Sequence, residues 1–347
     1  AVATTGANNV AVGGLALDAL TTASDNTAIG MQAFTALTTG TKNVAVGMRA
    51  GYQATAESNM TALGYNTLFG ANPGSNTTAV GAEALRSATG NDSTAVGFRA
   101  LYADTTGSSN TAVGRESSGS VTTGVNNTTV GYRSGYNLTT SSSNTAVGHS
   151  ALFSATTGTA NVAIGADAGE DISTGTRNTV VGNIAGSNIT SADDATMIGY
   201  GAGGTGVMTG HDNTGVGVQA LAYTTSGASN TAVGRNALEL NTTASNNTAV
   251  RYNAGKSITT GVQNTIAGST AGDAITTANS NTAFGYAALT DATTATLNVA
   301  VGSGALFDTT TGNDNTALGT NPLLSNTTGG NNIAIGRSAL RTATTVS

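Results

Sequence analysis

The sequence repeats with a period of about 17 residues along its full length of 347 residues. Each copy closes on a glycine that ends the phrase Asn-Thr-Ala-Val-Gly; the interval from Gly81 to Gly97 is one residue shorter, and that from Gly199 to Gly217 one residue longer. These positions are Gly13, Gly30, Gly47, Gly64, Gly81, Gly97, Gly114, Gly131, Gly148, Gly165, Gly182, Gly199, Gly217, Gly234, Arg251 (in the same slot), Gly268, Gly285, Gly302, Gly319 and Gly336. Because the 20 copies leave no other stretch, we predict a single repeat domain over residues 1–347.

Each copy is too short for a pair of helices and has the chemistry of a strand followed by turns. Helix-pair repeats need about 33 to 47 residues. The phrase Thr-Ala-Val is typical of strands, and the Thr-Thr-Gly corners, as at residues 105–107, are typical of turns. We therefore predict an all-β fold, a β-solenoid or parallel β-roll of about 20 coils of 17 residues that pair with one another.

The strand phrase is apolar on both sides. The residue before the glycine is aliphatic or Phe in 19 of 20 copies, with Ala267 as the exception, whereas Ala precedes it in 15 copies and Thr comes before that in 15. Because side chains alternate along a strand, the Thr and Val columns share one face and the Ala column takes the other. We expect the coil interior to cover one face and a neighbouring subunit, approaching closely at Ala, to cover the other. The alternative is that Ala faces water.

Two further columns have structural interpretations. Asn stands four residues before the glycine in 16 copies, which fits a coil-to-coil amide ladder or a turn that bonds its own backbone. The glycine indicates a positive φ or a close backbone approach. At Arg251 we therefore expect a local bulge or an outward-turned side chain.

Variation is concentrated just after the glycine, where partner contacts are expected on an otherwise uniform repeat. Aromatic residues also recur five residues after the glycine, as at Tyr102 and Phe307. The alternative interpretation is solvated decoration with corner packing. His211 joins the candidates because it lies in the lengthened copy. The candidate surface-contact residues are Tyr65, Tyr132, Tyr200, Tyr252, Tyr286 and His211.

Composition excludes several classes of function. With no Cys, the chain has no disulfide, thiolate metal site or Cys nucleophile. A net charge of −6 argues against nucleic-acid partners, and no apolar run is long enough for membrane insertion. His149 and His211 lack metal-ligand spacing, no phosphate-loop Lys follows the glycines, and the Ser and Thr residues lack a His and carboxylate partner. We expect no enzyme activity, metal or cofactor.

Two acidic pairs, Glu170–Asp171 and Asp193–Asp194, could hold a cation, although such pairs are usually exposed corners. The chain begins at Ala1 without a methionine, so we expect a processed product or part of a longer protein.

The phrase Asn-Thr-Ala-Val-Gly-x-x-Ala-Leu, at residues 230–238 and 281–289, resembles the head repeats of trimeric autotransporter adhesins. Residues 161–165 and 332–336, which end in Val-Ala-Ile-Gly and Ile-Ala-Ile-Gly, come nearest to it. The pattern also resembles repeat shafts of phage tail fibres and of bacterial proteins with tail-fibre-like domains. The resemblance covers essentially the whole chain and implies a left-handed parallel β-roll, assembled as a homotrimer and displayed extracellularly on a cell or virion. The adhesin heads use a shorter repeat, and the chain lacks the sustained heptads of their stalk, which favours the tail-fibre-like interpretation.

The leading hypothesis is a non-enzymatic structural or adhesive fibre, a rigid rod that mediates attachment to a surface glycan or protein receptor. An ice-binding β-solenoid is the alternative, because regular Thr columns can order water. Val or Ile replaces Thr in five copies, which suits a half-buried slot better than a water-facing plane. A polysaccharide depolymerase spike ranks third, because no pair of carboxylates recurs at facing positions.

Overall fold

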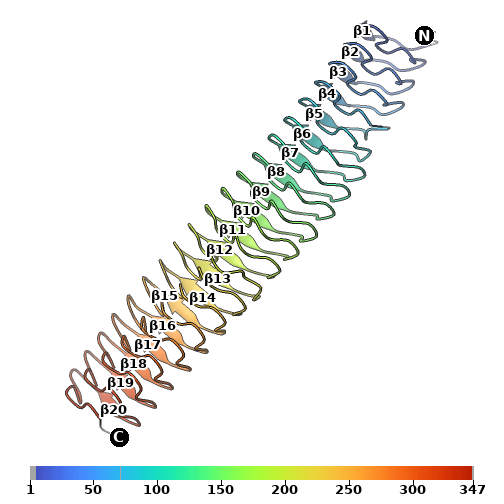
Figure 1. Cartoon of the computed structure of the whole chain (residues 1–347). Helices are drawn as coiled ribbons and strands as arrows, with labels where there is room; N and C mark the ends of the chain where they lie inside the picture. The colour runs from blue at the N-terminus through green and yellow to red at the C-terminus, as the bar shows by residue number, and fades with distance from the viewer. Residues whose placement is uncertain (1–4, 71, 346–347) are drawn as a thin grey trace. The chain divides into compact units, whose positions relative to one another are not determined.

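The computed structural model describes residues 5–70 and 72–345, so Ala1 lies outside the described residues. The chain divides into two compact units, Ala1–Thr174 and Gly175–Ser347, each with ten three-residue strands, one per coil (Figure 1). The strands of the first unit are β1 (Val10–Val12), β2 (Thr27–Ile29), β3 (Val44–Val46), β4 (Thr61–Leu63), β5 (Thr78–Val80), β6 (Thr94–Val96), β7 (Thr111–Val113), β8 (Thr128–Val130), β9 (Thr145–Val147) and β10 (Val162–Ile164). Those of the second unit are β11 (Thr179–Val181), β12 (Thr196–Ile198), β13 (Thr214–Val216), β14 (Thr231–Val233), β15 (Thr248–Val250), β16 (Thr265–Ala267), β17 (Thr282–Phe284), β18 (Val299–Val301), β19 (Thr316–Leu318) and β20 (Ile333–Ile335).

Within each unit the strands pair in parallel, each with the strand of the next coil. The shortened copy keeps Thr78 of β5 opposite Thr94 of β6, and the lengthened copy keeps Thr196 of β12 opposite Thr214 of β13. Both irregular intervals are therefore absorbed in the turns. The described part of the chain contains no helix. The predicted all-β solenoid of about 20 coils, each of about 17 residues, is confirmed, while its handedness, its trimeric state and its continuity across the two units stay predictions.

The two strand faces are reversed from our expectation. Ala28 and Ala112 are fully buried, and the burial pattern places the middle residue of each strand from β2 to β20 inside its coil, whereas Ala11 of the terminal strand β1 is exposed. The Thr and Val columns face outward, so our expectation that Ala would meet a neighbouring subunit or water is wrong. The physical reason is the small coil: so short a loop closes around a narrow interior, where close packing accepts small side chains beneath the strand. The larger β-branched residues therefore point outward.

The Asn column forms the predicted ladder. The backbone N–H of Asn127 donates to Oδ1 of Asn110 at 3.0 Å, and Nδ2 of Asn127 donates to the carbonyl of Ser141 at 2.9 Å. One buried amide thus ties three successive coils together and satisfies polar groups that water does not reach. The ladder is interrupted where the column holds another residue, at Met60, Thr77, Ser93 and Ala195.

The coil interior is filled by positions whose volumes compensate. Whenever the inward strand residue is larger than Ala, a glycine stands six residues later; these pairs are Thr129 with Gly135, Val180 with Gly186, Met197 with Gly203 and Ile266 with Gly272. A Cβ on Gly135 would lie 2.7 Å from Cγ2 of Thr129 and 2.6 Å from Cδ1 of Leu138. Such contacts are too short for a close-packed interior. The glycine makes room for its neighbours.

A second pair of columns compensates in the same way in most coils. The fourth residue after the repeat glycine is Leu where the seventh is small or polar, as with Leu85 and Ala88. It is Gly where the seventh is large, as with Gly135 and Leu138. The fourth residue also adopts a left-handed backbone, with φ of 48° at Leu85, which is uncommon for Leu.

Arg251 keeps the coil intact although it replaces the repeat glycine. Its backbone has φ of 101° and its side chain is exposed. The strand before it, β15, still pairs in register with both β14 and β16. The expected outward-turned side chain is confirmed, and the alternative of a bulge is wrong, because the side chain leaves the coil without shifting the ladder.

Candidate functional site

The outward face of each sheet carries two columns without a single charged residue. We call them the Thr column and the Val column. The Val column consists of Val12, Ile29, Val46, Leu63, Val80, Val96, Val113, Val130, Val147 and Ile164 in the first unit, and Val181, Ile198, Val216, Val233, Val250, Ala267, Phe284, Val301, Leu318 and Ile335 in the second. Many of its members are more than one third exposed. A continuous apolar stripe of this kind marks an interaction surface.

The largest and the smallest member of the Val column lie side by side. Phe284 of β17 pairs with Ala267 of β16, and Phe284 is 60% exposed. A hollow of about 450 Å³ opens here, bordered by Val250, Arg251, Ala267 and Phe284 among others. The outer face of the second unit therefore carries a knob directly beside a hole.

The corner after the repeat glycine carries stacked rings and arginines in the first unit. Tyr136 stacks on Phe153 with ring centres 5.5 Å apart. The guanidinium of Arg99 lies 5.2 Å from the ring centre of Tyr102 and donates to Glu83 at 2.6 Å. These rings are therefore covered by neighbours from the same coil or the adjacent one, as the corner-packing interpretation predicts.

The glutamates of this corner complete the same network. Arg133 donates to Glu116 at 2.6 Å. This hydrogen bond holds the pKa of the Glu116 carboxyl below its usual value and raises the pKa of Arg133. The Arg133 side chain is 40% exposed and the Glu116 side chain only 11% exposed, so a largely covered carboxylate pairs with a half-exposed guanidinium.

The candidate tyrosines occupy one repeat position but are not brought together. The exposed fractions are 44% for Tyr65, 37% for Tyr132, 53% for Tyr200, 48% for Tyr252 and 65% for Tyr286. Tyr65 and Tyr132 belong to the first unit and the other three to the second. Tyr132 packs against His149, with ring centres 5.4 Å apart. Tyr286 is the candidate that lines a corner hollow.

His211 has a structural partner. Its Nδ1 accepts the backbone N–H of Asp193 at 2.9 Å. In other coils the same repeat position does this with a short polar side chain, as when Ser245 accepts the N–H of Ala228 at 3.0 Å. His211 thus closes a turn rather than forming a special loop.

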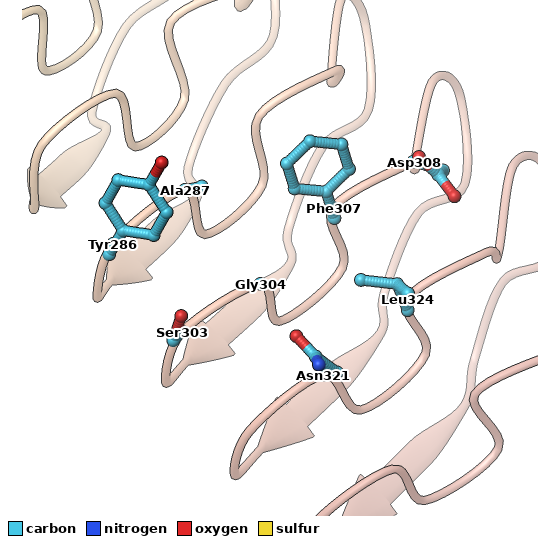
Figure 2. A pocket seen from close by; sticks show the side chains of 8 residues that line it. All are labelled: Tyr286, Ala287, Ser303, Gly304, Phe307, Asp308, Asn321 and Leu324. Carbon is cyan, nitrogen blue, oxygen red and sulfur yellow. The ribbon is translucent and has the colours of Figure 1, made fainter.

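The corner hollow lies over Gly304 in the second unit and has a volume of about 330 Å³ (Figure 2). Tyr286 and Phe307 stand beside it, Leu324 points toward it, and Ser303, Asn321 and Asp308 place polar atoms around it (Figure 2). Gly304 has φ of 62°, close to the 60° of Gln32, which bears a side chain at the same repeat position in another coil. The hollow exists because this coil lacks that side chain. We call it the Gly304 hollow.

Carboxylates from three successive coils run along this side of the second unit. Burial raises the pKa of Asp291, and the charge of Asp308 raises it further. Burial also raises the pKa of Asp273, with a smaller contribution from Asp291. The hollow is thus lined by the carboxyl group of Asp308 and by no Lys or Arg, which disfavours an anionic ligand.

A buried carboxyl that the sequence analysis did not single out lies in the first unit. Asp104 takes the seventh position after its repeat glycine, and its Oδ1 accepts the N–H of Gly107 at 2.8 Å while Oδ2 is buried without a partner. Burial raises its pKa to about 7. Asn241 fills the same position in the second unit and both accepts from and donates to the backbone of Ala244. The sequence signal that could have revealed this buried carboxyl is an Asp at the seventh position after the repeat glycine, a position that other copies fill with buried core residues.

Three of the four carboxylates in the acidic pairs considered as cation sites have protein partners. Asp193 accepts the backbone N–H of Thr176 at 2.7 Å, and Asp194 pairs with Arg177 at 2.6 Å. Asp171 accepts from Ser154 at 3.4 Å. Among residues 5–70 and 72–345, no group of three or more His, Cys, Asp or Glu side chains is arranged to hold a metal ion. The same residues include no helix that could span a membrane.

Comparison with known proteins gives no family assignment. No protein-family model matches the chain, and no curated protein matches it significantly. Function therefore has to be argued from the surfaces described above.

Proposed function

We propose that this chain is a non-enzymatic structural segment of an adhesive fibre, which self-associates as a homotrimer through its outer columns and is displayed outside a cell or virion. The uncharged outward face of the sheets carries this proposal. A sheet face that stays in contact with water is ordinarily lined by polar side chains. A face that repeats Thr and Val without one charge is suited to being covered.

The period of the face favours a second copy of the same chain as the cover. Apolar side chains recur once per coil, so a matching partner must present apolar groups at the same spacing. Another copy of this chain does so in every coil. Closed symmetric assemblies are also the commonest arrangement of identical chains. The number three comes from the resemblance to trimeric adhesin heads.

The knob and hole at Phe284 and Ala267 support the same conclusion. A solvent-facing column has no packing reason to place its smallest residue next to its largest. In a packed interface between copies, the space that Ala267 leaves accommodates the excess volume of Phe284, as volume-conserving changes do in a core.

Light scattering on the purified chain tests the proposal. We expect a mass near three times 33.7 kDa. Val130→Asp, on the outward face of β8, should shift the mass toward one chain because it buries a charge in the interface. Thr140→Asp, on an exposed turn of the following coil, is the matched control and should leave the mass unchanged. A wild-type chain that stays monomeric at micromolar concentration would overturn the trimer.

Ice binding is the second candidate, because the structure places the Thr column outward rather than in a buried slot. These Thr side chains are nevertheless half-buried, as the sequence argument against ice binding expects, and in coils such as those of β2 and β7 the neighbouring Val column is the more exposed of the two. An ice-recrystallisation assay on the Val130→Asp chain, with its outer columns released, distinguishes the two functions. Inhibition of crystal growth would favour ice binding over the fibre. Release of reducing ends from polysaccharide would instead favour the depolymerase.

A further inference from the structure

We infer that the Gly304 hollow binds one pyranose ring of a neutral surface saccharide, an inference that rests on the surface attachment proposed above. The hollow results from one missing side chain. Gln32 and Gln219 occupy the same repeat position with φ of 60° and 56°, whereas Gly304 has φ of 62° and no side chain, so that Oδ1 of Asn321 reaches over it and the hollow opens beside them. Its floor is formed by buried backbone at Ala287 and Gly304. The cavity is therefore built into the backbone and needs no rearrangement to accept a ligand.

The rings beside the hollow are free to contact a ligand. In the first unit, Arg86 covers both Phe69 and Tyr102 at 5.6 Å from each ring centre. Within the described residues, neither Tyr286 nor Phe307 has a ring or a cation on its face. Exposed aromatic surface next to a preformed cavity is typical of a ligand site.

The polar groups around the hollow match the rim of a sugar. A pyranose presents C–H groups on its faces, which pack on aromatic rings, and hydroxyl groups around its edge. Asp308 is an acceptor, while Asn321 and Ser303 both donate and accept. Figure 2 shows these three side chains around the hollow, with Leu324 adding apolar surface. An amphipathic ring of alternating C–H and O–H groups suits this mixture better than a purely apolar or purely charged ligand.

Size and charge narrow the ligand class. A volume of about 330 Å³ lies at the low end of the 300–1,000 Å³ typical of ligand pockets, which indicates room for one ring rather than a folded peptide. No Lys or Arg lines the hollow, and Asp308 lines it with Asp291 nearby. Acidic sugars such as sialic or uronic acids are therefore disfavoured, and a neutral hexose or N-acetylhexosamine is favoured.

Saturation-transfer NMR on the full chain tests the inference, with glucose, galactose, mannose and N-acetylglucosamine as neutral probes. N-acetylneuraminate is the anionic comparison, and choline is the cationic one. We expect at least one neutral sugar to give a saturable signal and N-acetylneuraminate to give none. A signal from choline alone would replace the saccharide by a cationic ligand. The absence of any saturable neutral sugar would overturn the inference.

Filling the hollow provides the decisive variant. Gly304→Gln should raise the dissociation constant of the bound sugar by about tenfold or more, because the new side chain occupies the hollow. The variant should still fold, because Gln is compatible with this backbone conformation and displaces only the flexible end of Asn321. Gly201→Gln is the matched control: it has the same repeat position and the same φ of 62°, but its Cβ meets nothing closer than 3.7 Å. Unchanged binding in Gly304→Gln would place the sugar elsewhere and overturn the site.

A second variant covers the case in which Gly304→Gln disturbs folding. Phe307→Thr removes the ring and introduces the residue that stands at this position in the preceding coil, Thr290. It should abolish the sugar signal while circular dichroism and light scattering remain as in the wild type. Because mass and sugar binding are measured separately, loss of the trimer and loss of the sugar site are distinguishable outcomes.

Discussion

Residues 82–153 of the first unit and residues 266–324 of the second occupy the same repeat positions and use them in opposite ways. In the first stretch the corner is closed, with rings covered by arginines and by one another. The core there holds polar side chains, including Ser117 bonded to Thr129 at 2.7 Å and the buried Asp104. In the second stretch the core holds Ile266 and Ile275, and the corner opens into the Gly304 hollow. One backbone template thus supports either a closed corner over a core that includes Ser, Thr and Asp side chains, or an open site in a stretch whose core includes isoleucines.

The contrast shows where this fold localises chemistry. The ladder of strands and amides is nearly constant along both units, so it cannot distinguish one coil from another. The corner and inner core positions vary independently of it. A functional site in such a repeat is therefore made by local departures, such as an absent side chain next to two rings.

The largest expected effect comes from giving Asp104 the residue that the second unit uses at its position. At pH 8, Asp104→Asn should raise the free energy of unfolding by about 4 kcal/mol, because the wild type must keep a buried carboxylate ionised there. The folded-state pKa of about 7 lies above the ordinary aspartate value of 3.8, so the wild type loses stability as pH rises through this window. The difference in unfolding free energy between Asp104→Asn and the wild type should vanish below pH 3.8.

Denaturant unfolding at pH 8 and at pH 3.5 measures this difference. The reciprocal change Asn241→Asp is the control, and it should introduce the same pH dependence into the second unit. Equal stability of Asp104→Asn and the wild type at both pH values would contradict the burial argument.

The next effect concerns the compensating core columns. Gly135→Leu should destabilise the first unit by about 1–3 kcal/mol, since the new side chain overlaps Leu138 and Thr129. Adding Leu138→Ala and Thr129→Ala should restore much of the loss, because Leu with Ala at these positions is the combination found at Leu85 and Ala88. Thermal unfolding of the single and triple variants provides the measurement. A triple variant no more stable than the single one would contradict volume compensation.

A smaller effect is expected at Arg251, in the second unit. Arg251→Gly should stabilise the fold by about 1 kcal/mol. A side chain held at φ of 101° is strained by about 1–3 kcal/mol, and the flexibility of Gly in the unfolded chain offsets part of the gain. The unfolding midpoint is the readout, with Gly234→Ala, one coil earlier, expected to move it in the opposite direction. A lowered midpoint for Arg251→Gly would contradict the strain argument and assign the arginine a stabilising contact.

The smallest effect separates closed from open corners. Arg86→Leu introduces the residue found at this position in the second unit, Leu324. It should cost about 0.5–1 kcal/mol of stability through loss of the cation over two rings. The reciprocal Leu324→Arg should leave stability nearly unchanged and weaken sugar binding by narrowing the Gly304 hollow. Sugar binding that survives Leu324→Arg undiminished would show that the two corners differ for another reason.

Much of the architecture could be predicted from spacing alone. The regular period determined the number of coils, the parallel pairing and the amide ladder, because identical residues must stack when coils repeat. The direction of the strand faces could not be predicted. Ala and Val are both apolar, so alternation does not say which is inside, and the narrowness of the coil decides it.

The candidate site was predicted only in part. Tyr286 was recognised from its column, but its hollow depends on the absence of a side chain at Gly304, one coil further on. The signal for the hollow combines neighbouring copies: a second glycine, Gly304, follows two residues after a repeat glycine, and aromatic rings stand at two other repeat positions, Tyr286 and Phe307. It becomes readable only once the coils are known to stack in register. His211 was singled out because it lies in the lengthened copy, whereas its turn contact with Asp193 depends on how that copy stacks on the preceding coil and could not be predicted from spacing.

The left-handed residue four positions after each repeat glycine also limits how the sequence can drift. Leu, Phe, Ser and Gly occur there, whereas Ile and Val appear three residues later at positions such as Ile172, Ile189 and Val121. Branching at Cβ is poorly compatible with a left-handed backbone. Two core positions that lie three residues apart and hold side chains of similar size and polarity therefore accept different sets of residues. Exchange between Leu and Ile, among the mildest changes in most cores, should be tolerated at one and selected against at the other.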